Sequence, residues 1–408
     1  MPELAESQLA RGMRDVLPDE MARLRRIEAS FGATCTAWGY GEIRTPVIEP
    51  LHLFTAAGTL SPQTLDRVYS FLDWDGWSGE RVVLRPDSTI AAARLYAERL
   101  SDSPVAKLFY CQPVLRFTDN GSSREEWQCG VELVGDTGRG GDVELVLLAL
   151  DALAGLGLGD VAVRLSHAGI VRAVLAAAGL ALDEQSAAYD RLLDGDLAVV
   201  DEIEARLPQL DAPLRVLFEI EGEGSSYIAN VRASLANALP GLSAALDELA
   251  FVVESLEARG MAPRIAAVLA RRFEYYSGIV MGFQYRGARV GAGGRYDELI
   301  HLVGGRNVPA SGFALFIDAL APNIAMPPKR SDVVRVVPEE GTPRSFAAAH
   351  EAASALRAAG FTVDTLAAAD GVVARILCGA DSRFTLEGAV SGSFEDVRQV
   401  ITALERKR

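Results

Sequence analysis

Arg271-Arg272-Phe273-Glu274-Tyr275-Tyr276 stands upstream of a glycine-rich turn, Gly293-Gly294-Arg295-Tyr296-Asp297. Together the two blocks hold three tyrosine hydroxyls, two carboxylates and three guanidinium groups. Carboxylates bind an ammonium group, guanidinium groups bind a carboxylate, and tyrosines offer both a ring face and a hydroxyl. The two blocks therefore predict a pocket suited to a small zwitterion that carries a polar ring.

The sequence around the glycine turn lacks the motifs of common catalytic and nucleotide-binding sites. Gly291-Ala292-Gly293-Gly294 has some likeness to a dinucleotide-binding loop, but it lacks the spaced third glycine and the strand–helix–strand setting of that loop. The chain holds no G-x-x-x-x-G-K-(S/T) phosphate loop and no G-x-S-x-G nucleophile turn. These absences favour binding over catalysis.

Length and composition indicate a multi-domain protein outside the membrane. A chain of 408 residues exceeds the size of a single core, so roughly two or three domains are expected. No run of ~18 uncharged apolar residues occurs, and the N-terminus has neither a basic start nor an apolar segment. We therefore expect no membrane span and no secretory signal, and the sequence predicts a cytoplasmic protein.

The cysteines and histidines show no spacing typical of a metal or redox site. Four cysteines lie far apart without a C-x-x-C pair, and four histidines are equally scattered. Cysteines placed in this way are mostly small buried hydrophobic residues, whereas a structural zinc site requires closely spaced ligand pairs. We expect no metal, no cofactor and no redox role for Cys35, Cys111, Cys129 and Cys378.

The charge gives mild evidence against nucleic-acid binding. The net charge is −15, whereas proteins that bind polyanions neutralise phosphates with lysine and arginine. The segment from Ser331 to Arg408 holds nine Lys or Arg residues against eleven Asp or Glu residues, and only one of them is a lysine. This segment does not have the composition of an RNA-binding module.

The first part of the chain is predicted to mix helices with strands. Pro18-Asp19-Glu20 predicts the start of an amphipathic helix that ends near Trp38, because an acidic first turn suits the helix dipole. A hairpin is expected around Asp75-Gly76, followed by a helix that Pro86-Asp87-Ser88-Thr89 caps. Two long strands are expected over 107–117 and 126–134.

The rest of the chain predicts the domain organisation. From about residue 142 to 270 the sequence is rich in alanine and leucine with helical periodicity, and we expect a helical insertion over 168–262. A strand is expected over 279–285, and prolines mark a linker over 321–330. We therefore expect a core over 1–320 and, over 331–408, a small α/β domain.

In chain order, the blocks of the first 320 residues resemble histidyl-tRNA synthetases, a class II family. Their opening is matched by Gly12 to Pro18, Trp38 to Pro46 and Leu84-Arg85-Pro86-Asp87-Ser88-Thr89. Their later motifs are matched by Leu115 to Glu132, Arg271 to Tyr276, Gly293 to Asp297 and Pro309 to Ala314. The resemblance implies an α+β fold of the class II aminoacyl-tRNA synthetase type, with a mostly antiparallel, six-stranded sheet flanked by helices.

The resemblance fails where a synthetase binds ATP. The family has R-x-E where this chain reads Arg116-Phe117-Thr118, and Glu126 stands where an aromatic residue stacks on adenine. Ala319 replaces the arginine that clamps the triphosphate, and Phe316 replaces a small glycine. Losing one contact to the transition state commonly costs about 10²–10³ in rate, so the resemblance implies a chain without catalytic activity.

The amino-acid half of the site keeps its residue types, and the resemblance assigns them to histidine binding. Asp87 and Glu132 would take the α-ammonium or imidazole nitrogens. Thr89 and Gln128 would be hydrogen-bonding neighbours, Arg116 and Arg271 would face the carboxylate, and Tyr276 and Tyr296 would line the imidazole. The full candidate set is Asp87, Thr89, Arg116, Gln128, Glu132, Arg271, Tyr275, Tyr276 and Tyr296. Arg272 replaces a glycine and Glu274 an aspartate, so a second interpretation stays open, in which these positions are relics that satisfy each other's charges.

The tail departs from that of the synthetases, because Asp364 to Asp370 runs almost directly into the next strand and leaves no lysine-rich helix. A synthetase-like core with altered ATP motifs and a short tail resembles the regulatory subunits of ATP phosphoribosyltransferase, non-catalytic paralogues in the first step of histidine biosynthesis. The resemblance implies a short catalytic subunit as partner, histidine as feedback effector, and a homodimer within a hetero-oligomer, formed through residues before about 50. It implies no tRNA and no membrane partner. Two alternatives remain open: a divergent histidyl-tRNA synthetase, and a paralogue that senses another amino acid or serves as a scaffold.

Overall fold

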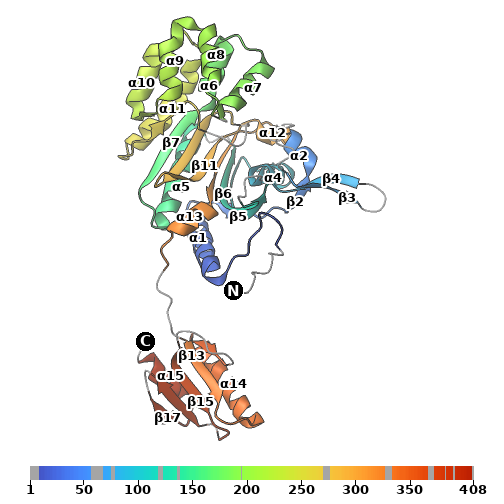
Figure 1. Ribbon diagram of the computed structural model, residues 1–408, viewed down its shortest axis with the longest axis vertical. Helices are drawn as coiled ribbons and strands as arrows, with labels where there is room; N and C mark the ends of the chain where they lie inside the picture. The colour runs from blue at the N-terminus through green and yellow to red at the C-terminus, as the bar shows by residue number, and fades with distance from the viewer. Residues whose placement is uncertain are drawn as a thin grey trace, which may run out of the picture. The chain divides into compact units, whose positions relative to one another are not determined.

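The computed structural model describes residues 9–56, 68–74, 79–117, 123–135, 138–193, 195–269, 276–326, 333–365, 372–381, 383–388 and 391–406. The chain divides into two compact units, Met1–Ala325 and Met326–Arg408 (Figure 1). Within the described residues, no helix has the length and apolar character needed to cross a membrane.

The first unit is built on one large mixed sheet. Its described strands run in the order β1 (Gly41–Glu42), β5 (Val105–Leu115), β6 (Glu125–Gly135), β12 (Ala310–Phe316), β11 (Ala288–Arg295), β10 (Ile279–Tyr285), β7 (Val161–His167), β9 (Arg264–Ile265) and β8 (Gly222–Glu223). Only the pairs β1–β5 and β7–β9 are parallel. All the other pairs of this sheet are antiparallel, among them the four that join β5, β6, β12, β11 and β10.

The predicted six-stranded sheet is therefore wrong in extent, because β7, β9 and β8 lengthen it to nine strands in the described residues. The strand β7 lies where alanine and leucine periodicity predicts helices. It holds β-branched Val161 and Val163 and pairs with β10 along its whole length, so long-range pairing decides its structure. The strands β8 and β9 have two residues each and give no signal in the sequence.

One face of the large sheet is covered by α1 (Pro18–Ala37) and α5 (Gly138–Gly155). The helix α1 begins at Pro18 with an acidic first turn, and it buries Leu24, Ile27, Phe31 and Cys35 along one stripe. It ends before Gly39, whose φ of 83° suits a residue without a side chain. Sheet residues such as Val131, Phe283 and Phe313 complete this core.

The cysteines are distant in sequence, but this face brings three of them together. Cys111 and Cys129 lie directly opposite each other on β5 and β6, and their Sγ atoms are 3.3 Å apart. Cys35 of α1 belongs to the same core, and burial raises the pKa values of both Cys35 and Cys129. All four cysteines of the chain are free thiols.

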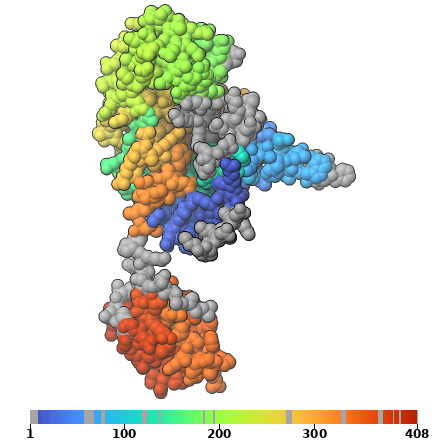
Figure 2. All heavy atoms as spheres, in the orientation of Figure 1, coloured from blue at the N-terminus to red at the C-terminus, as the bar shows by residue number. Residues whose placement is uncertain are grey.

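A second, smaller sheet lies beside the first and has the order β2 (Ile48–Pro50), β4 (Gly79–Leu84) and β3 (Ser70–Trp74). The strands β3 and β4 confirm the predicted hairpin, although its expected turn at Asp75-Gly76 lies outside the described residues. Figure 2 shows this hairpin standing out from the surface of the unit. The helix α2 (Leu51–Ala56) contacts the small sheet and also α4 (Ser88–Leu95), which continues as a π-helical turn over Tyr96–Leu100.

Between β7 and β9 the chain forms a cluster of helices with its own apolar contacts. The helices are α6 (Ala168–Ala177), α7 (Leu182–Leu193), α8 (Ala198–Arg206), α9 (Asp211–Glu219), α10 (Gly224–Leu235) and α11 (Leu242–Glu257). Figure 1 shows them gathered at one end of the first unit. The helices α11 and α6 contact each other and β7, so the cluster is continuous with the core. Two short helices, α12 (Leu299–Leu302) and α13 (Ile317–Leu320), flank β12.

The second unit has a five-stranded sheet in the order β14 (Thr362–Asp364), β13 (Val333–Pro338), β15 (Val372–Cys378), β16 (Phe384–Gly388) and β17 (Gly392–Phe394). The helices α14 (Pro343–Ala358) and α15 (Val397–Glu405) contact each other and pack on this sheet. Alternate residues, Val334 and Val336 on β13 and Ala374 and Ile376 on β15, form its core. Strand-like runs over 333–337, 361–365 and 372–378 and a helical run over 345–359 predict β13, β14, β15 and α14, whereas β16, β17 and α15 come from the structure alone.

Candidate functional site

The face of the large sheet opposite α1 and α5 carries the candidate residues, and we call it the site face. Because side chains alternate along a strand, Tyr110 of β5 and Gly130 and Glu132 of β6 share this face with their register partners Ala314 and Gly312 of β12. Glycine and alanine on these middle strands leave room above the sheet. Larger side chains from the neighbouring segments occupy that room.

Glu132 is the centre of the site face. Its side chain is buried and accepts hydrogen bonds from the hydroxyls of Tyr110, at 2.9 Å, and of Tyr296. The Thr89 hydroxyl also hydrogen-bonds to this carboxyl group. Burial raises the pKa of Glu132 well above its usual value, since these hydroxyls offset only part of the lost hydration.

Three glycines allow this arrangement. A Cβ atom at Gly130 would lie 2.2 Å from the Tyr110 ring, and a Cβ atom at Gly312 would lie 2.4 Å from both the Glu132 carboxylate and the Tyr296 hydroxyl. A Cβ atom at Gly294 would lie 2.6 Å from the Tyr276 ring. The aromatic rings can therefore approach the sheet only where no side chain stands.

Asp87 is the second buried carboxyl group of the site, and α4 positions it. As predicted, this segment caps α4: Asp87 Oδ1 accepts a hydrogen bond from the Ile90 amide at 2.9 Å. Burial raises the pKa of Asp87, while the charge of Arg116 lowers it by a smaller amount. The charge on Asp87 in turn raises the pKa of Glu132, so the two carboxyl groups repel each other when both are ionised.

Arg116 lies at the edge of this acidic pair, directly after β5. Its Nε donates to the Pro86 carbonyl oxygen at 2.8 Å, and its Nη1 donates to Glu126 Oε2 at 3.0 Å. Glu126 lies on β6, where it pairs with Val114 and shares the site face with Glu132. Arg116 thus connects the segment that carries Asp87 to Glu126, which lies on β6 at the opposite end from Glu132.

Tyr276 connects the site to the helical insertion. Its ring packs beside Gly294, and its carbonyl oxygen accepts a hydrogen bond from Arg172 of α6 at 2.9 Å. Burial raises the pKa of its hydroxyl, and Tyr276 packs against Val280, as does Tyr189 of α7. Helices of the insertion therefore help to hold one wall of the site.

A buried network of charged groups continues behind this wall. Arg295 donates to Asp142 with an Nη2–Oδ2 distance of 2.5 Å, and its Nη1 is 3.7 Å from Glu248 of α11. His167 accepts from the Gly169 amide through Nδ1, which places the ring proton on Nε2, 3.3 Å from Glu248. Burial lowers the pKa of His167, so the neutral form is favoured.

The structure brings six of the nine candidate residues to one face. Gln128 lies buried on β6, two residues before Gly130 and on the same face as Glu132. The other residues of this group are Asp87, Thr89, Tyr276 and Tyr296. Arg116 lies at the margin of this group. Arg271 and Tyr275 lie outside the described residues, as do Arg272 and Glu274.

Two positions at which the resemblance departs from the synthetases, Glu126 and Phe316, lie at the other end of the site face, whereas Ala319 packs against the core beneath the sheet. Phe316 pairs with Gln128 across β12 and β6, and the guanidinium group of Arg289 lies 5.7 Å from the centre of its ring. Ala319 follows in α13, where Asp318 accepts from the Trp127 amide and from Arg14. An alanine side chain and an acidic neighbour offer no cation to a phosphate group.

Sequence reasoning missed two residues that shape the site, Tyr110 and Arg85. Tyr110 is signalled only by register, because it stands opposite Gly130 in the paired strands. Arg85 is 1% exposed and donates to the carbonyl oxygens of Thr45, Pro46 and Pro113, which fixes the approach of the chain to Asp87. The only sequence signal for Arg85 is its position two residues before Asp87 in the block Leu84 to Thr89.

The comparisons with known proteins agree with this geometry. Residues 12–320 match the histidyl-tRNA synthetase family. An ATP phosphoribosyltransferase regulatory subunit from Dehalococcoides mccartyi is 48% identical over 315 residues, which cover 77% of this chain and 76% of that protein. A second such subunit, from Symbiobacterium thermophilum, is 35% identical over 326 residues, which cover 78% of this chain and 80% of that protein.

A solved structure extends the likeness over most of the chain. An ATP phosphoribosyltransferase regulatory subunit/histidyl-tRNA synthetase from Bacillus halodurans superimposes on this chain with a TM-score of 0.77 and 26% sequence identity. The superposition covers 93% of this chain and 100% of that one. The chain therefore belongs to the histidyl-tRNA synthetase family and, within it, to the ATP phosphoribosyltransferase regulatory subunits.

Proposed function

We propose that the chain, as the non-catalytic regulatory subunit of ATP phosphoribosyltransferase, binds free histidine between Asp87 and Glu132 and so makes the enzyme sensitive to the end product of its pathway. The observation that carries the proposal is the pair of buried carboxyl groups. Burial raises both pKa values, and Asp87 raises that of Glu132 further. A bound ammonium or imidazolium group would relieve this cost, since an opposite charge favours the ionised carboxylates.

The other contacts of the site suit the remaining parts of histidine. The hydroxyls of Tyr110 and Tyr296 already converge on Glu132, and the Tyr276 ring lies beside Gly294. Aromatic faces and hydroxyls can pack on an imidazole ring and hydrogen-bond to its nitrogens. Arg116 at the margin would meet the carboxylate of the ligand.

Regulation requires a partner and two states. We propose that the partner is a short catalytic subunit of ATP phosphoribosyltransferase, and that histidine binds one arrangement of the complex more tightly than another. A ligand shifts an equilibrium only by its difference in affinity for the two states. The hydrogen bond from Arg172 of α6 to Tyr276 offers a route from the pocket to the helical insertion.

The decisive experiment reconstitutes the complex and assays its transferase activity with and without histidine. The Glu132→Gln variant should assemble with the catalytic subunit and support activity, but it should lose inhibition by histidine. Glu254→Gln, an exposed change on α11, is the matched control and should be inhibited as the wild type is. If the transferase alone is fully active and equally sensitive to histidine, the proposed role is wrong.

Direct binding separates the alternatives. Histidine at ~100 times its Kd should stabilise the isolated chain or its complex by about 2.7 kcal/mol, and other amino acids should do so less. A preference for another amino acid would indicate a different sensor, and no response to any would favour a scaffold. Histidine-dependent exchange of pyrophosphate with ATP would instead reveal a synthetase.

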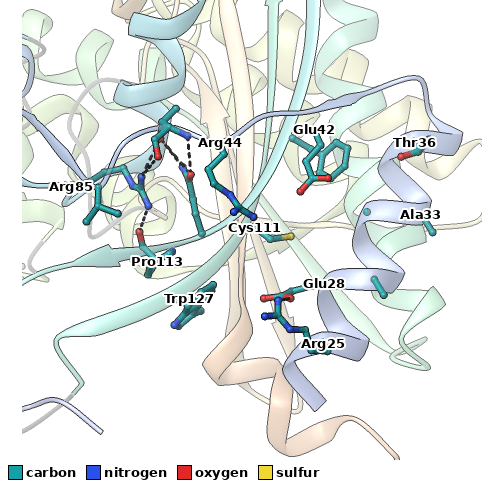
Figure 3. A pocket seen from close by; sticks show the side chains of 16 residues that line it. Arg25, Glu28, Ala33, Thr36, Glu42, Arg44, Arg85, Cys111, Pro113 and Trp127 are labelled. Carbon is teal, nitrogen blue, oxygen red and sulfur yellow. Dashed lines mark hydrogen bonds and ion pairs between the residues drawn. The ribbon is translucent and has the colours of Figure 1, made fainter. Parts of the chain in front are cut away.

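We further propose that the chain forms a homodimer through the surface around α1 and β1. A hollow of about 680 Å³ opens there between α1, β1 and the edge of β5 and β6, and Figure 3 shows Arg25 and Glu28 of α1 and Trp127 along it. Arg44 and Glu42 line the same hollow, so the surface carries both signs of charge. Such a mixture suits a two-fold interface, in which each patch meets a copy of itself.

The oligomeric state tests this surface. In sedimentation equilibrium the wild type should be a dimer, and Arg44→Glu should weaken the dimer by disturbing the charge balance. Arg259→Glu alters an exposed arginine outside this hollow and serves as the control. A wild-type monomer, or equal effects of the two substitutions, would contradict the proposed interface.

A further inference from the structure

The ion pair between Arg116 and Glu126 occupies the margin of the proposed histidine pocket. The Nη1–Oε2 distance is 3.0 Å, and the two side chains are 14% and 27% exposed. Arg116 is also fixed through Nε to the Pro86 carbonyl oxygen, next to Asp87. The guanidinium group is therefore held between Asp87 on one side and Glu126 on the other.

This order of charges fits one part of an α-amino acid at each position. The acidic pair attracts the ammonium group, and the neighbouring guanidinium group attracts the carboxylate. Glu126 already supplies a carboxylate to Arg116 from within the chain. A ligand carboxylate that binds Arg116 therefore meets a competitor that belongs to the protein.

We propose that Glu126 is a specificity-determining residue that occupies Arg116 in the empty site and is displaced by the carboxylate of an incoming amino acid. This inference rests on the proposed histidine-binding function. It predicts that the site rejects anions that have no ammonium group: they gain the Nη1 donor of Arg116 only by displacing Glu126, and the acidic pair repels them. An amino acid offsets that displacement through its contacts with Asp87 and Glu132.

The register of β6 gives a matched control. Glu126 lies on the site face with Gln128 and Glu132, whereas Glu125 lies on the opposite face of the same strand. Both residues are partly buried glutamates in neighbouring positions. Glu125→Gln therefore removes the same charge from the strand without releasing Arg116.

Calorimetric titration of the full chain with L-histidine and with histamine, which lacks the carboxylate, tests the inference. Removing the competitor should strengthen histidine binding by about three- to tenfold in Glu126→Gln, since a charged hydrogen bond to Arg116 no longer has to be exchanged. Histamine binding should change by less than about twofold, because histamine does not contact Arg116. Glu125→Gln should leave both affinities as in the wild type.

Several results would overturn the inference. Equal or weaker histidine binding by Glu126→Gln, or an equal gain for histamine, would show that Glu126 does not compete for Arg116 and would leave the histidine pocket itself standing. Absence of histidine binding in every protein would remove the proposed function and this inference with it. Glu126→Asp, whose shorter side chain withdraws the carboxylate from Arg116, should show the same gain if Glu126→Gln does not fold.

Discussion

The packing of Tyr110 over Gly130 gives a prediction whose size follows from the structure. A Cβ atom at position 130 would lie 2.2 Å from Cζ, 2.4 Å from Cε2 and 2.4 Å from the hydroxyl oxygen of Tyr110. Real Cβ atoms do not approach other atoms this closely, and Tyr110 is 1% exposed, so the ring has no free space to enter. Overpacking of a core by one methyl group typically costs about 1–3 kcal/mol, and we expect Gly130→Ala to fall in this range.

A double-variant cycle isolates the clash. Tyr110→Leu removes the far end of the ring, so Gly130→Ala should cost much less in that background, with a coupling of at least about 1 kcal/mol. The free energy of unfolding in urea measures all four proteins. Gly140→Ala in α5 is the control, since a Cβ atom there meets nothing within 4 Å, and alanine is favoured over glycine in a helix.

Additive effects of Gly130→Ala and Tyr110→Leu would refute the reasoning, because they would show that the two positions do not contact each other. A Gly130→Ala protein as stable as Gly140→Ala would refute it as well. The cycle also reports on the site, since the Tyr110 hydroxyl donates to Glu132 at 2.9 Å. A shifted ring should therefore weaken histidine binding in Gly130→Ala.

Three further predictions concern charges and thiols. Because burial raises the pKa of Glu132, the folded chain keeps the carboxyl proton at pH values at which the unfolded chain has lost it, so stability falls as the pH rises above about 4.3. Glu132→Gln should reduce this fall in the free energy of unfolding between pH 5 and 8, measured in urea. An unchanged dependence of stability on pH would contradict the assignment. Asp142→Asn should cost up to about 3–5 kcal/mol, because it removes the buried carboxylate that pairs with Arg295 and leaves that partly buried arginine with only Glu248 at 3.7 Å. Asp381→Asn, at an exposed pair with Arg383, should cost less than about 1 kcal/mol, and equal losses would contradict this contrast. Burial raises the pKa values of the Cys35 and Cys129 thiols, and it raises that of Cys378 to about 12. At most one thiol of the native chain, Cys111, should therefore react with a thiol reagent at pH 8. Two or more reactive thiols would show that these cores open.

The sequence predicts most of the elements that carry the site, because those elements have local signals. Pro18 with its acidic turn marks α1, Asp87 marks the start of α4, and strand-like runs over 107–117, 126–134 and 279–285 mark β5, β6 and β10. The prediction fails for β7, whose identity depends on pairing with β10 rather than on its own composition. Likewise no local pattern reveals that Cys111 and Cys129 meet, since only the register of β5 and β6 brings them together.

The family resemblance is confirmed by the 48% identical regulatory subunit, whereas the roles of the individual site residues stay predictions. The ion pair of Arg116 shows the limit of motif matching. A match assigns Arg116 to a ligand, but it cannot show that Glu126 from the same chain holds that arginine at 3.0 Å. Such contacts depend on which side chains share a strand face, which a motif does not record.

The proposed site would bind an amino acid but no nucleotide, and charge accounts for the difference between its two halves. By the resemblance, Ala319 replaces a cation and Glu126 replaces a neutral aromatic residue, so the charge on this side would be more negative by two than in a synthetase. A single unit charge at ~7 Å contributes about 2 kcal/mol at an effective dielectric constant of ~20, so two such changes oppose a triphosphate strongly. The same negative charge favours a cationic group beside Asp87 and Glu132. Substitutions that oppose ATP in this way would leave the acidic pair, and with it the attraction for an ammonium group, in place.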